Sequence, residues 1–201
     1  DAGTALTLAG TTSIIDTTNN GGNTTGAGIT LGGAVDGTAD NAQSLTLNAG
    51  TGGAIDVQST IGATASKQLA TLTVTDSNGA TFTGAVTTDT SVVLTDTTDA
   101  AAITFNGALT TPTLTTAAQG YNLVLNGGAT ITSAFTATHT GTLTLGNDAA
   151  DVLLFDGGVT ATAPSGVTLN GTLRTSGDTV SLGDAGTALT LAGTTSIIDT
   201  T

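Results

Sequence analysis

The chain has 201 residues, a formal net charge of −13 and 50 threonines, and these numbers already exclude several classes of protein. Only Lys67 and Arg174 are basic, so the chain cannot neutralise a phosphate backbone, and we expect no nucleic acid among its partners. Because there is no Cys, and no apolar run near the roughly 20 residues that span a bilayer, we also expect no disulfide, no thiolate metal site and no membrane span.

Short stretches in which apolar residues alternate with Thr follow one another along the whole chain. A period of two is typical of a β-strand with one buried face. Good helix formers other than Ala are scarce, and 38% hydrophobic residues is too many for a disordered chain, so the fold class is all-β. The expected strands are 5–8, 28–31, 44–47, 71–74, 91–94, 103–105, 122–125, 142–145, 166–169 and 188–191.

The opening segment of the chain returns unchanged at its end. Residues 1–18 and 184–201 both read DAGTALTLAGTTSIIDTT, so that Asp184 repeats Asp1. We interpret 1–183 as one complete tandem repeat unit and 184–201 as the start of the next identical unit. Self-similarity at a fixed period indicates a repeat architecture in which each unit contacts its neighbours.

Turn residues between the strands favour a β-solenoid. Asn-Gly pairs begin at positions 20, 78, 106, 126 and 170, and Asp-Gly pairs begin at 36 and 156. Both dipeptides supply the positive φ that tight corners need. The longer strands follow one another at irregular steps, so we expect one such strand per coil and about 8–9 coils, or rungs, in the unit 1–183. The alternative is two β-sandwich domains of about 90 residues per repeat, which would carry a more aromatic core.

Three motifs recur in related forms along the chain. They are Leu-Thr-Leu-Asn-Ala-Gly at 45–50, Ala-Thr-Phe-Thr-Gly-Ala-Val at 80–86 and Val-Thr-Leu-Asn-Gly at 167–171. In these motifs the chain resembles giant bacterial β-strand-repeat surface proteins with filamentous-haemagglutinin-like β-solenoids. The resemblance implies an exported protein at the cell surface, with a role in adhesion or in filament structure.

Few residues suit catalytic chemistry. His139, the one histidine, lies in the alternating stretch Thr-Ala-Thr-His-Thr, and we expect a solvent-facing strand residue. Paired carboxylates cleave polysaccharides in some enzymes, but Tyr121 would be the single aromatic platform for a sugar. We therefore expect no catalytic residue and no enzymatic activity.

Two groups of aspartates are candidate calcium ligands, because Ca²⁺ takes oxygen ligands from clustered carboxylates. Asp also stabilises turns through its own hydrogen bonds and keeps a protein soluble. We expect these structural roles and no cofactor, and keep calcium as the alternative. The two groups are Asp148, Asp151 and Asp156, and Asp89, Asp96 and Asp99.

Thr-x-Thr triplets raise a further possibility. They occur at 71–73, 81–83, 130–132 and 142–144. A flat array of outward Thr is one way for a solenoid to bind ice, but it needs Thr pairs at constant spacing on one face. The irregular steps between strands argue against that arrangement.

These observations predict a structural repeat unit of an extracellular filament or giant surface adhesin, assembled by end-to-end stacking of β-coils. Its partners would be neighbouring identical repeats, through self-association into fibres, and a host or neighbouring-cell surface. A chain without thiols or thioethers, and with two basic residues for trypsin-like proteases, suits exposure outside the cell. The alternatives are a calcium-dependent surface-layer or adhesive module and an ice-binding Thr-rich solenoid.

Overall fold

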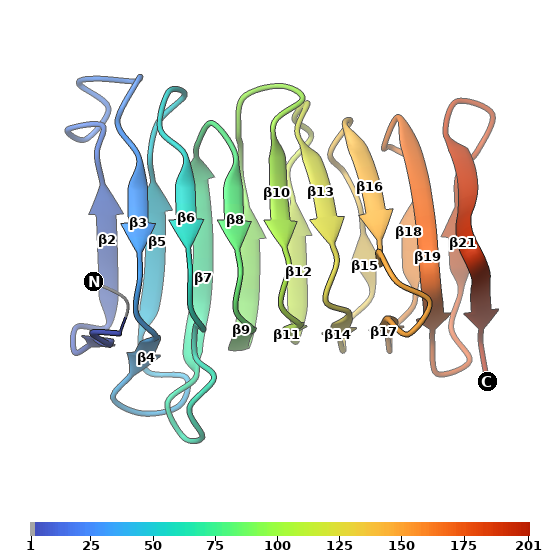
Figure 1. Ribbon diagram of the computed structural model, residues 1–201, viewed down its shortest axis with the longest axis horizontal. Helices are drawn as coiled ribbons and strands as arrows, with labels where there is room; N and C mark the ends of the chain where they lie inside the picture. Colours follow the sequence, from blue (N-terminus) through green and yellow to red (C-terminus); the bar gives the residue numbers. More distant parts are fainter. Residues whose placement is uncertain (1–2) are drawn as a thin grey trace.

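A computed structural model describes residues 3–201, and the chain in it is an all-β solenoid. Successive coils follow one another along the long axis, from β2 and β3 near the N-terminal end to β21 at the other (Figure 1). Every strand pairing between these residues is parallel and joins one coil to the next. The β-solenoid expectation is therefore confirmed, and the two-sandwich alternative, which requires antiparallel sheets, is wrong.

The coils place their strands on three faces, which we number in the order of their strand ladders. On face two, one coil contributes Ile61 alone, which bridges Val35 and Val86. Face one holds β3 (Ile29–Leu31), β6 (Ile55–Val57), β8 (Ala80–Phe82), β10 (Ala102–Phe105), β13 (Asn122–Leu125), β16 (Thr142–Leu145) and the first parts of β19 (Gly166–Arg174) and β21 (Ala188–Asp199). Face two holds β1 (Leu6–Leu8), β4 (Val35–Gly37), the start of β9 (Val86–Leu94), β11 (Leu109–Thr111), β14 (Ala129–Ile131), β17 (Val152–Phe155) and the second parts of β19 and β21. Face three holds β2 (Thr12–Asp16), β5 (Ser44–Asn48), β7 (Leu69–Asp76), the end of β9, β12 (Thr113–Thr116), β15 (Phe135–Thr136), β18 (Val159–Ala161) and β20 (Val180–Leu182).

The number of coils differs from the expected 8–9. Seven steps join the eight paired strands of face one, from Ile29 through to Leu189. The coils also vary in length, because Ile29 pairs with Ile55 whereas Ile103 pairs with Leu123, which is nearer in sequence. The unit 1–183, which also includes β1 and β2, holds seven whole coils and a fraction, so the expected count is slightly too high. The excess arises because similar strands on different faces look equivalent in the sequence. The stretches at 44–47, 71–74 and 91–94 belong to face three, whereas 122–125 and 142–145 belong to face one.

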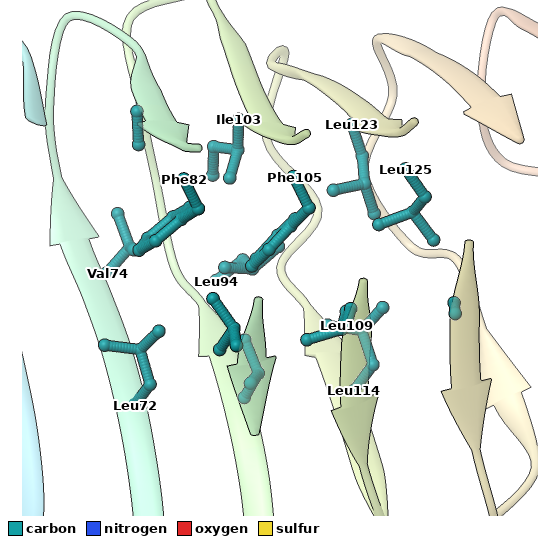
Figure 2. Packing of buried hydrophobic residues seen from close by; sticks show 14 of the residues in the cluster. Leu72, Val74, Phe82, Leu94, Ile103, Phe105, Leu109, Leu114, Leu123 and Leu125 are labelled. Carbon is teal, nitrogen blue, oxygen red and sulfur yellow. The ribbon is translucent and has the colours of Figure 1, made fainter. Parts of the chain in front are cut away.

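The core is a set of apolar columns that run along the axis. On face one, Leu125, Leu145 and Leu169 occupy paired positions in successive coils, and all three are fully buried. The rings of Phe82 and Phe105 stack in the same way, with centroids 4.7 Å apart, and Figure 2 shows them among Leu and Ile side chains of neighbouring coils. Because residues alternate inward and outward along each strand, the Leu and Thr of the Leu-Thr-Leu motifs separate onto the two sides of the sheet.

One corner is lined with glycines because successive coils approach too closely there for a side chain. A Cβ on Gly107 would lie 2.3 Å from the carbonyl carbon of Gly84, and a Cβ on Gly127 would lie 2.5 Å from that of Gly107. Neither Gly107 nor Gly127 has a positive φ, although Gly79 of another Asn-Gly pair does, at 92°. The Asn-Gly and Asp-Gly pairs thus serve two purposes, and positive φ explains only some of them.

No helix with the length and apolar character of a membrane span occurs between residues 3 and 201.

Candidate functional surfaces

The two ends of the solenoid are open sheet edges. At the N-terminal end β1, β2 and β3 each pair with one neighbour, and at the other end β20 and β21 do the same. These edges expose inward-facing apolar side chains: Leu6 is 37% exposed and Leu191 58%. An unpaired edge with uncovered apolar residues is a template for further strand pairing. The ends are therefore the first candidate surface.

The two copies of the repeated segment form these two ends, and both copies are strands. In both, the same positions point inward, because Leu6 and Leu189 each pair with a core valine. Their faces differ. Leu6 pairs with Val35 on face two, whereas Leu189 pairs with Val167 on face one.

A double column of outward residues on face three is the second candidate surface. Each residue pairs with the next in its column, one coil apart, and none is buried. The hydroxyls of Thr71 and Ser91 lie 3.1 Å apart. The hydroxyl column is Thr12, Ser44, Thr71, Ser91 and Thr113, and the second column is Ile14, Thr46, Thr73, Val93 and Thr115.

Irregular steps between strands in the sequence do not prevent a regular Thr array, so that expectation is wrong. The steps are irregular because they join strands that lie on different faces. Along one face the spacing is always one coil, about 4.8 Å, because parallel strands set it. Extra residues in long coils are placed in the corners and leave the columns in register.

Face one carries a single outward Thr column. It contains six threonines, interrupted by Asp56 and Val124, and its members pair directly from coil to coil. Beside it, the amide of Asn126 donates to the carbonyl oxygen of the Asn106 side chain at 2.9 Å. The six are Thr30, Thr81, Thr104, Thr144, Thr168 and Thr190.

The aspartates of the first candidate metal group hold turns instead of facing one another. Asp151 Oδ2 accepts hydrogen bonds from the backbone N–H of Asn147 and of Asp148, both at 2.9 Å. Asp148 Oδ1 accepts from the N–H of Ala150 at 2.9 Å. Asp156 lies beyond β17, where Ser176 Oγ donates to it. These are the bonds expected of Asp in turns.

The second group is also dispersed. Asp89 lies within β9, Asp96 accepts a hydrogen bond from the N–H of Thr97 at 2.8 Å, and Asp99 lies beside Gly120 of the next coil. Across residues 3–201, no three acidic or histidine side chains are grouped closely enough to hold a metal ion.

His139 is buried, so the expectation of a solvent-facing histidine is wrong. Its ring stacks on Tyr121 with centroids 5.3 Å apart, and neither ring nitrogen has a hydrogen-bond partner. Burial lowers the pKa of His139. The alternation could have shown this, since Phe135, Ala137 and His139 are successive inward residues of one strand and its continuation.

Tyr121 is also inside and offers no platform for a sugar. Its hydroxyl donates to the carbonyl of Leu94 at 3.1 Å and accepts from the N–H of Ala117 at 3.2 Å. Burial raises the pKa of Tyr121, so the phenol keeps its proton. No pocket occurs among residues 3–201. What it offers a partner is edges and flat faces.

No family model, curated protein or solved structure matches the chain.

Proposed function

We propose that the chain is a structural repeat unit of an extracellular filament or giant surface adhesin, whose units join end to end by stacking β-coils. The observation that carries this proposal is the pair of open ends. The same repeated segment forms solenoid strands at both, with one edge paired and the other free. A free edge of this kind is stabilised by the next coil, and a tandem copy would supply that coil.

The composition supports a location outside the cell. No residue is a Cys or a Met, so oxidation has no sulfur to attack, and 15 Asp give a charge that keeps long assemblies soluble. The partners in this proposal are identical neighbouring repeats and, at the far end of the array, a host or neighbouring-cell surface. The role is mechanical: length, stiffness and durability, without catalysis.

The test uses a chain in which the unit 1–183 is followed by a second complete unit. Parallel coils spaced by about 4.8 Å should make each added unit lengthen one continuous rod by about 37 Å in electron micrographs. Two separate bodies joined by a flexible link would overturn the proposal.

A matched pair of substitutions sharpens this test. Leu191 is 58% exposed in the 201-residue chain, but Leu8, the same residue in the first copy, is 4% exposed under the following coil. Leu191→Asp should therefore lower the free energy of unfolding by less than about 1 kcal/mol in the 201-residue chain, and by several kcal/mol in the two-unit chain. Thr190→Asp, on the outward side of the same strand, should have a small effect in both. Equal effects of Leu191→Asp in the two chains would contradict stacking.

The double column on face three favours ice binding as a second candidate function. Two adjacent columns of mostly hydroxyl residues, about 7 Å apart across the strand and about 4.8 Å apart along the axis, form a regular flat lattice. Thermal hysteresis of the purified chain is the direct measurement. Loss of hysteresis in Thr73→Lys, with no loss in Thr104→Lys on face one, would support this candidate; no hysteresis in the unmodified chain at high concentration would remove it.

A further inference from the structure

We propose that successive units in the array are rotated about the fibre axis by one face, about a third of a turn, and that they join without a linker. The inference rests on the proposed end-to-end function and specifies its geometry. It follows from the different faces on which the structure places two identical segments.

The first junction contact comes from the strand that contains Leu189. In the 201-residue chain this strand pairs on one side with β19, where Leu189 lies opposite Val167 and Thr190 opposite Thr168. Its other edge is free. The first copy shows which strand the same sequence accepts on that other edge: Leu6 lies opposite Val35, and the N–H of Leu6 donates to the carbonyl of Ala34 at 2.8 Å. In a continuous array one strand makes both pairings, so face one of a unit continues as face two of the next.

The second contact repeats the same shift. Ile197 lies opposite Thr172 on face two, whereas Ile14, the same residue in the first copy, lies opposite Thr46 on face three. An ion pair supports the face-two position of the second copy, since Arg174 Nε lies 3.1 Å from Asp199 Oδ2. The pair is exposed and contributes little stability, but it belongs to this placement alone. Face two thus continues as face three.

The third contact joins the two edges that remain. β20 ends face three with Val180 and Leu182 inward and Ser181 outward, and both apolar residues are only partly buried beside its free edge. β3 begins face one with Ile29 and Leu31 inward and Thr30 outward, and one of its edges is also free. The two strands have the same length and share the order apolar, hydroxyl, apolar. β20 of one unit therefore pairs with β3 of the next, and all three faces continue across the junction.

The rotation decides how the array displays its surfaces. Because each unit adds seven whole coils and a fraction, the double column of face three turns to a new side in every unit. It returns to the same side after three units. A filament built this way presents the same surface all around its circumference. Contact with a partner therefore does not depend on the rotation of the filament about its long axis.

Paired cysteines distinguish the rotated junction from an unrotated one, since the chain has no cysteine of its own. Directly opposed outward residues of neighbouring strands lie within the Cα separation that a disulfide accepts. In the two-unit chain, Ser181→Cys should form a disulfide with Thr30→Cys of the second unit. An unrotated junction would place the second copy of β2 on face three, and Ser181→Cys would then link to Ile197→Cys. Thr168→Cys with Thr190→Cys in the 201-residue chain is the positive control.

The outcomes separate failure of the rotation from failure of the proposed function. Near-complete oxidation of the Ser181–Thr30 pair, with no link between Ser181 and Ile197, is the expected result. A Ser181–Ile197 link, or no link at all in particles that remain continuous rods, would overturn the rotation and leave the filament intact. Separate bodies in micrographs would overturn both. Images of an unmodified three-unit chain give an independent readout, because the averaged rod should show a rotation of about a third of a turn per unit.

Discussion

Leu145→Asp, compared with Thr144→Asp, tests the division of each strand into an inward and an outward side. The two residues are neighbours in β16. Leu145 is fully buried in the column between Leu125 and Leu169. Thr144 is part of the outward Thr column, between Val124 and Thr168, and neither of these neighbours is charged.

The structure gives the two substitutions very different magnitudes. Removing a buried leucine side chain costs about 2–5 kcal/mol, and placing an unpaired carboxyl group in the remaining space adds about 1–3 kcal/mol. Leu145→Asp should therefore lower the free energy of unfolding by at least about 4 kcal/mol, a large part of the roughly 5–15 kcal/mol that stabilises a typical domain. Thr144→Asp loses some β propensity, within a scale of about 1 kcal/mol, and meets no like charge on its neighbours in the column.

Urea unfolding followed by circular dichroism measures both free energies. If Leu145→Asp does not fold, Leu145→Ala provides the same test. It should lower the free energy of unfolding by about 2–5 kcal/mol, against less than about 1 kcal/mol for Thr144→Ala. Effects of Leu145 and Thr144 substitutions that agree within about 1 kcal/mol would refute the assignment of sides.

Three further predictions follow from particular contacts. Gly107→Ala should cost about 1–3 kcal/mol because its Cβ would lie 2.3 Å from backbone, whereas Gly166→Ala, whose nearest neighbour is 3.8 Å away, should be neutral or slightly stabilising in thermal melts. Burial depresses the pKa of His139 in the folded chain, so the unfolded chain takes up a proton more readily. The free energy of unfolding should therefore fall as the pH drops below 6.5, the ordinary pKa of His. In urea titrations at several pH values, His139→Phe should remove this pH dependence, and an unchanged dependence would contradict the reasoning. Asp151→Ala loses two hydrogen bonds of 2.9 Å and should lower stability by about 1–2 kcal/mol, equally with calcium or with a chelator; a calcium-dependent rise in the melting temperature of the unmodified chain would instead favour a metal role.

The strands could be predicted from the sequence because alternation is a local property. The expected strands 44–47, 122–125 and 142–145 match β5, β13 and β16 to within a residue. Each needs only its own residues, since Thr faces outward and Leu inward wherever the strand is placed. The all-β class and the solenoid followed from the same local pattern.

The assignment of strands to faces could not be predicted, because it depends on the corners. A Leu-Thr-Leu strand is equally suited to any of three faces, so 71–74 and 122–125 look alike although they lie on faces three and one. The missing information is how much of the chain each corner uses, and this varies from coil to coil. The hydroxyl columns were invisible for the same reason: the sequence contains their members but not the register that aligns them.

The burial of His139, in contrast, is contained in the local alternation of its strand. Its strand continues the alternation of Phe135 and Ala137, so its side could have been assigned by counting in twos. The polar character of histidine suggested solvent instead. Inside the column, however, an imidazole needs only to be neutral and flat, because Tyr121 stacks against its face. A flat ring therefore fits this position, and phenylalanine would fill it without burying two nitrogens that lack hydrogen-bond partners.

The number of strands in a unit decides how a solenoid array is built from identical units. Units stack in the same orientation only if each contains a whole number of coils, and any residual fraction becomes a rotation. The coils within the unit 1–183 differ in length, so no single coil length fixes the remainder. Inserting residues into one exposed corner would leave the columns and the rotation unchanged, whereas deleting one strand with its corner would shift every following unit by one face. The pitch at which a surface patch repeats along such a filament is thus set by whole strands, and evolution can alter it without changing a single core contact within the remaining coils.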